Sequence, residues 1–476
     1  MFEGQKCLII GSGISGIGAA ALLSHYEVEM ILYDSNEKLR VEELEEKLAK
    51  ACGEEEKDGN IPGGSGAWRD RIQCITGELP EETEKQIQIV VLSPGVPTDI
   101  PMVKRLRDRG ARILGEIELA FLAEKGRVAA VTGTNGKTTT TTLLGEIVKA
   151  YKGEEKTFVV GNIGNPYTLQ ALKTSEDSVT VGELSSFQLE TVHTFRPRVS
   201  AILNITPDHL NRHHTMEAYV EAKEAVAKNQ TGEDLCVLNY ENEYTRNFGE
   251  RCPARVVWFS SARELEEGLF LRGDRIICRF AGEERDLMDI RKDMNLVGIH
   301  NAENVMAAIA MAEGLGIPME TILEVIRNFK AVEHRIEYVA TKRGVVYYND
   351  SKGTNPDAAI QGIKAMDRPT VLIAGGYDKE NTYDEWIESF DGKVKWLVLI
   401  GQTREKIAEC AKAHGLQQIR FADTYEECLK LCTSLAEPGD AVLLSPACAS
   451  WGMFPNYETR GRMFKDYVNA LSDEEE

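Results

Sequence analysis

The chain has 476 residues, 42% of them hydrophobic, which at about 150 residues per domain predicts a globular protein of three domains. With 55 Lys and Arg against 76 Asp and Glu, its formal net charge is −21, and a chain this acidic is not expected to have a nucleic-acid partner. No stretch approaches the ~20 apolar residues of a membrane-spanning helix, so we expect no membrane partner either.

Short apolar runs alternate with helical patterns along the chain, which is typical of βαβ units and parallel sheets. Helices end near residue 124 and near residues 329–333, where new strands begin. The sequence therefore predicts an α/β fold with domains at residues 1–124, 125–332 and 333–476. The predicted strands form three groups: residues 7–10, 28–33 and 87–92; residues 128–131, 157–160, 179–181 and 199–203; and residues 345–348, 371–374, 394–400 and 441–444.

Three local features interrupt this pattern. Residues 52–68 are rich in Gly, Glu and Asp, and predict a surface loop. Residues 336–340 and 345–349 predict a hairpin that turns at Lys342–Gly344. The acidic residues 472–476 predict a frayed tail.

A glycine-rich turn, Gly11–Gly18, follows the first predicted strand, and Asp34 ends the second. This arrangement resembles a dinucleotide-binding fingerprint and favours a diphosphate or ribose near the first helix. The pattern does not say which nucleotide binds, and a purely structural tight turn remains an alternative.

The strongest motif is TGTNGKTT at Thr132–Thr139, which follows a buried-looking strand and opens a helix. This is the context of a phosphate-binding P-loop: backbone N–H groups surround phosphate oxygens, Lys137 reaches the outer phosphates and Thr138 binds Mg²⁺. Val131 stands where the usual motif has its first Gly, so the loop is a shortened one.

Polar residues also follow the later strands of the middle group. Glu183 ends a strand and is well placed to hold Mg²⁺. Asp208 and His209 follow the next strand and could serve a second metal or a substrate carboxylate, although a hydrogen-bonded structural histidine is equally compatible. Lys223 lies in a mixed-charge helical segment, and the residues around it predict a solvated lysine.

In the last third, three loops follow strands: residues 349–355, 375–379 and 444–451. They are expected to share the ligand-binding edge of one sheet, although each alone is compatible with ordinary turn chemistry. Asp350 could accept hydrogen bonds from ribose hydroxyls or metal-bound water, and Lys352 and Thr354 could meet anions.

Together these motifs resemble the Mur ligase family, the ATP-dependent amide-bond ligases of peptidoglycan precursor assembly. TGTNGKTT is similar to the family's shortened P-loop, and the resemblance runs from the first strand to the last helix. It also rests on three shorter motifs: Gly161–Gly164, His300–Asn304 and Glu333–Arg335. Three others resemble the branch that adds D-glutamate to UDP-N-acetylmuramoyl-L-alanine: SPGVP at Ser93–Pro97, ELSSFQLE at Glu183–Glu190 and SPACAS at Ser445–Ser450.

The resemblance implies a Rossmann-like N-terminal domain, a P-loop ATPase-like central domain and a Rossmann-like C-terminal domain. It implies a reaction through an acyl phosphate, with ATP, two Mg²⁺ ions and small-molecule substrates. The N-terminus lacks a basic and apolar leader, and the ten cysteines form no Cys-x-x-Cys pair. We therefore expect reduced thiols and a cytoplasmic protein. We also expect the protein to be a monomer.

The resemblance also assigns roles to residues. The UDP-binding positions would be Ile14, Ser15, Asp34, Ser93 and Gly95. The ATP-binding positions would be Gly133, Thr134, Asn135, Gly136, Lys137, Thr138, Thr139, Asn301, Arg335 and Asp350. The positions around D-glutamate would be Thr354, Lys379, Ser450 and Tyr457. The catalytic residues would be Lys137, Lys223, His209 and Asn162, and the metal ligands Thr138, Glu183, His209 and Lys223 as its CO₂ carbamate.

Three alternatives remain open at this point. An NAD-dependent dehydrogenase would use Gly11–Gly18, but leaves the P-loop and Glu183 unexplained. A P-loop switch or scaffold would hydrolyse nucleotide in order to bind a partner. A ligase of the same fold, such as a sister Mur ligase or a folylpolyglutamate synthase, would act on another acceptor.

Overall fold

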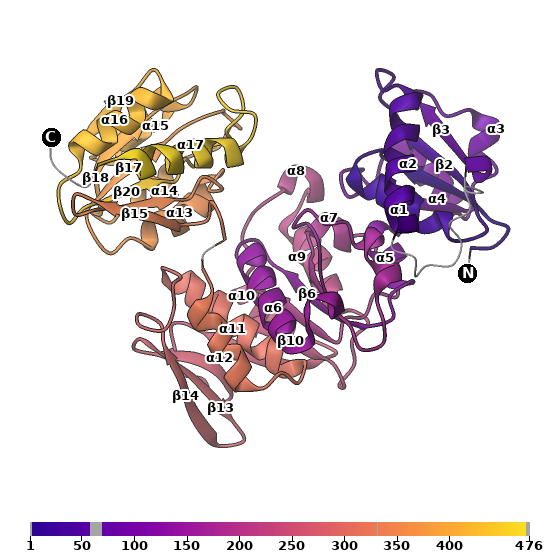
Figure 1. Cartoon of the computed structure of the whole chain (residues 1–476), viewed down its shortest axis with the longest axis horizontal. Coiled ribbons are helices and arrows are strands. Elements are labelled where there is room, and N and C mark those ends of the chain that lie inside the picture. Colours follow the sequence, from indigo (N-terminus) through magenta and orange to yellow (C-terminus); the bar gives the residue numbers. More distant parts are fainter. Residues whose placement is uncertain (1, 58–68, 331, 473–476) are drawn as a thin grey trace. The chain divides into compact units, whose positions relative to one another are not determined.

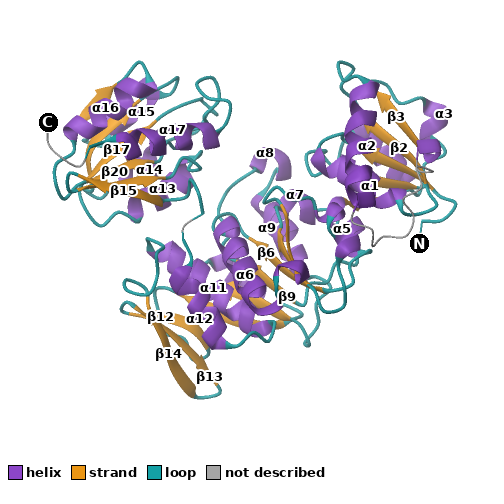
Figure 2. Cartoon of the chain, viewed as in Figure 1, coloured by secondary structure: helices purple, strands orange, loops and turns teal. Residues whose placement is uncertain are grey.

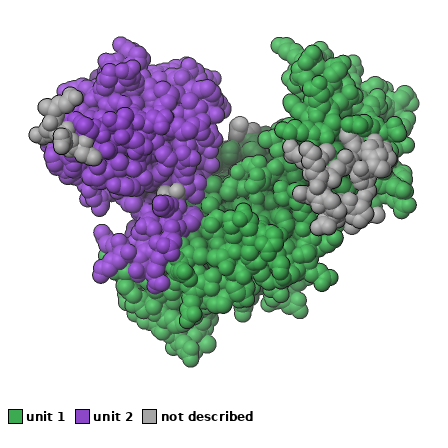
Figure 3. All heavy atoms as spheres, viewed as in Figure 1, with its two compact units in different colours: residues 1–289, 303–326 green, residues 290–302, 327–476 purple. Residues whose placement is uncertain are grey.

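The computed structural model describes residues 2–57, 69–330 and 332–472 (Figure 1). Two compact units make up the chain (Figure 3): Met1–Asp289 with Glu303–Ile326, and Ile290–Ala302 with Arg327–Glu476. Helices and strands alternate in both units, as Figure 2 shows. Among the described residues, no helix combines the length and apolarity needed to span a bilayer.

The first sheet has five parallel strands in the order β3-β2-β1-β4-β5. The strand order reverses between β1 and β4, and such a reversal opens a ligand crevice at the carboxyl ends of the two strands. The strands are β1 (Lys6–Ile10), β2 (Glu29–Asp34), β3 (Ile72–Thr76), β4 (Ile89–Leu92) and β5 (Arg112–Gly115). Its helices are α1 (Ile14–Ser24), α2 (Val41–Lys57), α3 (Glu81–Glu84), α4 (Pro101–Asp108) and α5 (Glu116–Phe121).

The second sheet of this unit has nine strands in the order β14-β13-β12-β11-β10-β9-β6-β8-β7. The parallel strands are β6 (Arg127–Thr132), β7 (Thr157–Gly161), β8 (Val179–Glu183), β9 (Val199–Ile202), β10 (Leu235–Asn239), β11 (Arg255–Ser260) and β12 (Gly268–Arg272). The helices that follow are α6 (Lys137–Lys152), α7 (Ser186–Leu189), α8 (Leu210–His213), α9 (Met216–Glu224), α10 (Glu243–Gly249), α11 (Ile299–Gly314) and α12 (Met319–Asn328). Strand β6 lies in the sheet interior and is almost wholly buried, so the loop after it starts from a rigid base.

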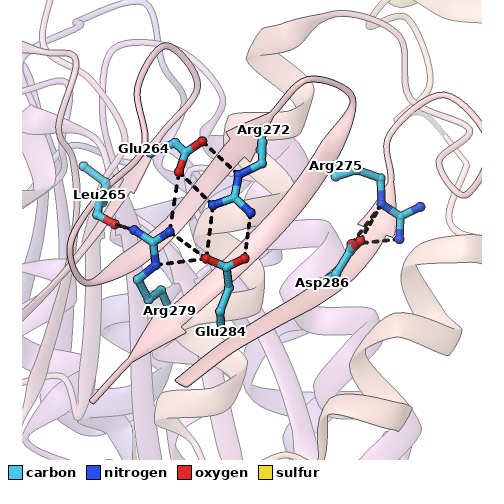
Figure 4. Close-up of polar contacts among 7 residues, drawn as sticks. All are labelled: Glu264, Leu265, Arg272, Arg275, Arg279, Glu284 and Asp286. Atoms are coloured by element: carbon cyan, nitrogen blue, oxygen red, sulfur yellow. Dashed lines mark hydrogen bonds and ion pairs between the residues drawn. The ribbon is translucent and has the colours of Figure 1, made fainter. Parts of the chain in front are cut away.

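Two antiparallel strands, β13 (Arg275–Phe280) and β14 (Glu283–Asp289), extend this sheet beyond β12. Their exposed face carries a network of ion pairs (Figure 4). Arg272 and Arg279 each contact Glu264 and Glu284, and the shortest distances, both to Glu284, are 2.6 Å. Strand β14 is the edge of the sheet, and a charged edge discourages pairing with another chain.

The second unit holds a six-stranded sheet in the order β15-β16-β20-β17-β18-β19. Only the hairpin of β15 and β16 is antiparallel. The strands are β15 (Glu337–Lys342), β16 (Val345–Asn349), β17 (Thr370–Ala374), β18 (Val394–Leu399), β19 (Ile419–Phe421) and β20 (Ala441–Leu444). The helices are α13 (Pro356–Lys364), α14 (Asp384–Glu388), α15 (Arg404–Ala413), α16 (Tyr425–Leu435) and α17 (Tyr457–Ala470). Alternate residues of β17 enter two separate apolar cores, one on each face of the sheet.

The predicted α/β fold class is confirmed, and every predicted strand corresponds to an observed one. The hairpin is confirmed as well: Arg343 and Gly344 form its two-residue turn with φ values of 52° and 76°. The loop predicted from residue 52 is wrong over Cys52–Lys57, because α2 continues to Lys57 and buries Leu44, Leu48 and Cys52 on one face. The rest of that loop, at residues 58–68, and residues 473–476 of the tail lie outside the described residues.

Candidate active site

The loop between β6 and α6 has the shape of a phosphate cradle. Gly133 and Gly136 have φ values of 148° and 87°, backbone conformations that residues with a Cβ rarely adopt. A Cβ on Gly136 would also lie 2.2 Å from Oδ1 of Asn304, so a glycine is required there. The Lys137 Nζ donates hydrogen bonds to the carbonyls of Gly133 (2.9 Å) and Thr134 (2.8 Å). The lysine is thus held against the cradle that it would share with a phosphate.

Two residues beneath the loop fix its shape. Asn204 accepts from the N–H of Asn135 (2.8 Å) and donates to its carbonyl (3.1 Å), while its own carbonyl accepts from the N–H of Thr134 (2.9 Å). The Tyr219 hydroxyl lies 3.0 Å from the Thr134 hydroxyl. The sequence did not predict a role for Tyr219, since an aromatic residue on a helix is usually part of the core. The cradle is therefore organised before any ligand binds.

Lys223 of α9 is buried directly behind the P-loop, with only 2% of its surface exposed. Its Nζ donates to the Gly133 carbonyl at 2.7 Å and lies 4.7 Å from the centre of the Tyr219 ring. Burial, reinforced by the charge of Lys137 and opposed by Asp208, holds the pKa of Lys223 well below its ordinary value. The prediction of a solvated lysine, drawn from the local sequence, is wrong. Lys223 shares the inward face of α9 with Tyr219 and Ala222, and the buried Val226 lies in the 3₁₀ turn that directly follows the helix.

Asn162 and Glu183 meet at the ends of the paired strands β7 and β8. Asn162 donates from Nδ2 to Oε1 of Glu183 at 2.8 Å, and its backbone N–H donates to the Glu183 carbonyl, also at 2.8 Å. Glu183 is 1% exposed, and its Oε2 has no hydrogen-bond partner among the described residues. A buried carboxylate oxygen without a partner is costly, and a bound cation would satisfy it.

His209 lies in the segment that leads into α8. Its backbone is left-handed with φ of 53°, its side chain is half exposed, and its Nε2 lies 3.5 Å from Asp208 Oδ2. The Phe187 ring packs against it at 4.9 Å between centroids. His213, four residues after His209, is buried. The sequence did not single it out. Burial lowers its pKa, and its Nε2 lies 2.9 Å from the Ser186 hydroxyl.

The predicted UDP-binding residues lie in loops at the carboxyl edge of the first sheet. Ser12 donates to Asp34 Oδ2 from its hydroxyl (2.6 Å) and its backbone (3.0 Å), and the N–H of Asn36 donates to Oδ1 (3.0 Å). Burial acts to raise the pKa of Asp34, but these hydrogen bonds hold it below its ordinary value. The Ser93 hydroxyl donates to the Gly11 carbonyl at 3.1 Å, which joins the loops after β1 and β4.

Of the other three predicted UDP positions, Ile14 and Ser15 open helix α1, and Gly95 lies in the loop after β4. Ile14 starts α1 and is 68% exposed, which is unusual for a large apolar side chain and leaves it available to a ligand. The Ser15 hydroxyl donates to Glu116 Oε2 at 3.0 Å. A Cβ on Gly95 would meet nothing within 4 Å, so this glycine borders open space.

Asp350 is a buried acid at the end of β16 in the second unit. It is 6% exposed and accepts from the Ser445 hydroxyl at 2.7 Å and from the Ile336 N–H at 3.3 Å. Burial raises its pKa to about 7, against the opposing effects of Ser445 and Arg335. Arg335 lies between two residues with left-handed backbones, His334 and Ile336. Asn301, the remaining predicted ATP position of this unit, donates from Nδ2 to the Val297 carbonyl at 2.7 Å.

A buried arginine ties the loops of the second unit together. Arg460 of α17 is 3% exposed and donates to the Ser351 hydroxyl (3.0 Å), the Ser351 carbonyl (2.7 Å) and the Cys448 carbonyl (3.3 Å). Burial lowers its pKa to about 10. The sequence did not predict this role, because one arginine in a charged helix carries no signal of burial. Arg460 therefore fixes the loops after β16 and β20, which are neighbours in the sheet.

The predicted amino-acid-binding residues lie around these loops. Ser450 is buried, and the Tyr457 carbonyl accepts from the Ser351 hydroxyl at 2.8 Å. The Lys379 Nζ lies 5.2 Å from the centre of the Trp451 ring, a cation–π distance that places the loops after β17 and β20 together. The N–H of Thr354 donates to the Lys352 carbonyl at 2.8 Å. As predicted, the three loops share one edge of the sheet.

Comparison with known proteins agrees with this geometry. Three family models match successive parts of the chain: "Mur ligase MurD-like, N-terminal domain" at residues 5–115, "Mur ligase middle domain" at residues 131–312 and "Mur ligase, glutamate ligase domain" at residues 334–448. A UDP-N-acetylmuramoylalanine–D-glutamate ligase of Lachnoclostridium phytofermentans is 55% identical over 99% of this chain and 100% of the relative. One of Lachnospira eligens is 54% identical over 98% of this chain and 99% of the relative.

A solved structure shows the same fold at lower identity. The UDP-N-acetylmuramate-alanine ligase MurC of Thermotoga maritima superposes with a TM-score of 0.57, at 18% identity, over 98% of this chain and 99% of that one. The three-domain α/β arrangement expected from the motifs is therefore confirmed. By its sequence matches along almost its whole length, the chain belongs to the Mur ligase family.

Proposed function

We propose that this enzyme uses ATP to join D-glutamate to UDP-N-acetylmuramoyl-L-alanine, in the synthesis of peptidoglycan precursors. One observation carries the chemistry: the buried Lys223 amine and the Lys137 ammonium both bind the Gly133 carbonyl of a preformed phosphate cradle. The choice of acceptor and amino acid is supported by two UDP-N-acetylmuramoylalanine–D-glutamate ligases that are 54–55% identical over nearly the full chain.

ATP is proposed to bind with its phosphates in the loop Gly133–Thr139. The N–H groups of this loop and the start of α6 favour an anion, and Lys137 adds a positive charge at the outer phosphates. To reach them, Lys137 would exchange its two loop carbonyls for phosphate oxygens. In the second unit, the proposed ATP contacts are Asn301, Arg335 and Asp350.

The residues present fit magnesium. Glu183 offers a buried oxygen that has no described hydrogen-bond partner, and Thr138 directly follows the P-loop lysine. We assign one Mg²⁺ to these two residues, and a second to His209 and Lys223 in its carbamate form, with Asn162 orienting Glu183. Bound there, Mg²⁺ would neutralise the negative charge of phosphate and carboxylate oxygens.

The low pKa of Lys223 makes a carbamate chemically accessible. The neutral amine nitrogen forms a bond to the carbon of CO₂ and loses one proton to water, which turns a neutral side chain into an anionic metal ligand. We expect a carbamate carbon signal in the ¹³C NMR spectrum of the enzyme in labelled bicarbonate. The signal should vanish in Lys223→Gln and persist in Lys149→Ala, a change at an exposed lysine of α6. A signal that survives Lys223→Gln would contradict the assignment.

The reaction itself overcomes the poor reactivity of a carboxylate. The γ-phosphoryl group of ATP passes to the carboxylate of the L-alanine residue, which gives an acyl phosphate. The amine of D-glutamate then attacks the carbonyl carbon, phosphate leaves and an amide remains. Lys137 and the loop N–H groups stabilise the charge that develops on the transferred group.

The remaining site residues are assigned to the two organic substrates. We place the uridine diphosphate in the loops with Ile14, Ser15, Asp34, Ser93 and Gly95, supported by their position at the reversal of the first sheet. We place D-glutamate near Lys379, whose ammonium suits a carboxylate, with Thr354, Ser450 and Tyr457. We propose a monomer as the active form. The ten free cysteines suit the reducing cytoplasm.

Phosphate release tests this proposal directly. With ATP and UDP-N-acetylmuramoyl-L-alanine, D-glutamate should support turnover, whereas L-glutamate, L-lysine and meso-diaminopimelate should not. Lys137→Ala should reduce the rate at least ~100-fold without unfolding the protein, because it removes transition-state charge stabilisation. Lys149→Ala removes the same charge from the exposed side of α6 and should leave the rate unchanged. Turnover with L-lysine or meso-diaminopimelate instead would assign the chain to another branch of the family.

A further inference from the structure

Four side chains with metal-binding atoms meet on helices α14 and α15 of the second unit. Asp384 and Glu388 are four residues apart on α14, and Cys410 and His414 are four residues apart at the end of α15. Residues at this spacing share one face of a helix. The ligand atoms of Asp384, Cys410 and His414 all lie within 4.8 Å of one another. Three donors from two helices thus lie close together, and Glu388 approaches them through His414.

The distances suit a tetrahedral cation. His414 Nε2 lies 3.8 Å from Asp384 Oδ1 and 3.5 Å from Glu388 Oε1, and the Cys410 sulfur lies within 4.8 Å of the ligand atoms of Asp384 and His414. Four ligands placed ~2.0–2.3 Å from one ion are separated from each other by similar distances. Only small side-chain rotations are therefore needed to bring the donors onto a metal.

The imidazole of His414 is already oriented for this role. Its Nδ1–H donates to the Cys410 carbonyl at 2.9 Å, which directs the other nitrogen, Nε2, toward the carboxylates. A hydrogen bond from the non-ligating nitrogen is the usual support of a metal-bound histidine. The His414 side chain is only a quarter exposed, whereas the two carboxylates are mostly exposed and leave a path for an ion.

The electrostatic surroundings favour a positive charge. Burial, together with the charges of Asp384 and Glu388, raises the pKa of Cys410 to about 11. The hydrogen bond to the Cys410 carbonyl and the same two carboxylates raise the pKa of His414. The raised pKa of Cys410 means that a metal ion must displace the thiol proton in order to bind the sulfur.

We propose that Asp384, Glu388, Cys410 and His414 form a binding site for Zn²⁺. The donor set combines one sulfur, one nitrogen and two carboxylate oxygens, which selects zinc over magnesium, because magnesium prefers six oxygen ligands. On binding, the Cys410 thiol loses its proton to water and the thiolate sulfur bonds to the ion. This site is separate from the magnesium positions proposed for the reaction.

Zinc bound here would connect helices α14 and α15, which adjoin loops of the proposed D-glutamate-binding region. The loop with Lys379 leads into α14, and Thr403, at the start of α15, accepts a hydrogen bond from the Gly376 N–H at 3.1 Å. A metal that joins α14 to α15 would therefore restrict the motion of these loops. The proposed role is structural support, independent of the identity of the ligase substrates.

Cobalt substitution tests the site, because a cysteine-ligated Co²⁺ gives a thiolate-to-metal absorption band that oxygen-ligated Co²⁺ lacks. The metal-free, full-length chain is titrated with Co²⁺ in excess Mg²⁺, and then with Zn²⁺ against a colorimetric chelator. The wild-type chain should show the band and bind one Zn²⁺ that displaces Co²⁺. Cys410→Ser should abolish the band, and His414→Gln should weaken binding at least ~10-fold.

Two further variants separate this site from unspecific binding. Cys74→Ser removes a partly exposed cysteine on the first sheet and should retain the band. Asp384→Asn combined with Glu388→Gln should keep the thiol but weaken Zn²⁺ binding. Zn²⁺ should also raise the melting temperature of the wild-type chain and of Cys74→Ser, but not that of Cys410→Ser. A wild-type chain without the band, or a band that survives Cys410→Ser, would overturn the proposal.

Discussion

Asp350 lies in surroundings that favour its protonated form. Its carboxyl group is buried, and a Cβ on Gly353 or Gly362 would lie within 3 Å of its Oδ2. These two glycines allow the backbone to close around the acid and exclude water. Since burial raises the pKa of Asp350 from 3.8 to about 7, its charge state is coupled to folding.

The sign of this coupling predicts a pH dependence of stability. Below pH 3.8 the carboxyl is protonated in both the folded and the unfolded chain, so burial of the charge costs nothing. Between 3.8 and 7 the unfolded chain loses the proton and the folded chain keeps it, so the stability of the folded state falls as pH rises. Above pH 7 the cost is constant. Asp350→Asn removes this dependence.

Denaturant unfolding measures the effect. The free energy of unfolding of Asp350→Asn relative to the wild type should rise by about 3 kcal/mol between about pH 5 and about pH 8. Ser445→Ala removes a hydrogen bond that lowers the pKa of Asp350, so its transition should move to higher pH. Parallel pH profiles for Asp350→Asn and the wild type would show that Asp350 does not titrate in this range.

Among single residues, the sequence predicted the site residues that lie in recognisable motifs. It missed the polar residues whose role depends on being buried. Lys137 and Glu183 follow strands, and that position marked them in advance. Lys223 was assigned to the solvent from its charged neighbours, and only the family resemblance suggested its role. The position of Tyr219 and Ala222 on the same helical face could have indicated that the lysine points inward. Nothing local marked Arg460, because its partners come from loops distant in the sequence.

Among the elements, the charged hairpin of β13 and β14 differs most from the rest of the fold. Apart from the hairpin strand at residues 336–340, the predicted strands are buried ones, whose apolar runs stand out in the sequence. Strand β14 begins with Glu283, Glu284, Arg285 and Asp286, and gave no such signal. Its pairing with β13 and the ion pairs across the two strands stabilise it instead. Hydrogen bonds from Arg272 and Arg279 lower the pKa of Glu284 to about 2.

Exposed ion pairs of this kind are expected to contribute little and to depend on salt. Glu284→Gln should lower the melting temperature by about 2 °C in ~20 mM salt and by less in ~1 M salt, where charges are screened. Glu283→Gln makes the same change at the neighbouring position and serves as the control. Ligase turnover should be unaffected by either variant. A large, salt-independent loss in Glu284→Gln alone would show that the network supports the fold.

For the molecule as a whole, the net charge of −21 opposes the binding of anionic substrates. Lys137, Lys352, Lys379, Arg335 and the N–H groups at helix starts must act locally against this field. We therefore expect little long-range attraction of ATP or the UDP substrate. The magnesium ions proposed at Glu183 and His209 would then supply much of the positive charge at the phosphates.

Two measurements check this expectation. The kcat/KM for UDP-N-acetylmuramoyl-L-alanine should change less than ~2-fold between ~20 and ~200 mM KCl, because no strong attraction is there to be screened. EDTA should abolish phosphate release, and added Mg²⁺ should restore it. Full activity in EDTA, or a steep fall of kcat/KM with salt, would contradict the role given to the metal.

The two compact units interleave along the chain, because residues 290–302 belong to the second unit and residues 303–326 return to the first. Val297 packs against the core of the second unit, and that core includes Leu443 of strand β20. During synthesis the segment leaves the ribosome about 140 residues before β20, a delay of roughly 7–30 s at ~5–20 residues per second. The first unit can fold within that time, but the apolar side chains of 290–302 must wait in solvent. Val297 therefore reaches its full set of native contacts only after β20 has been synthesised.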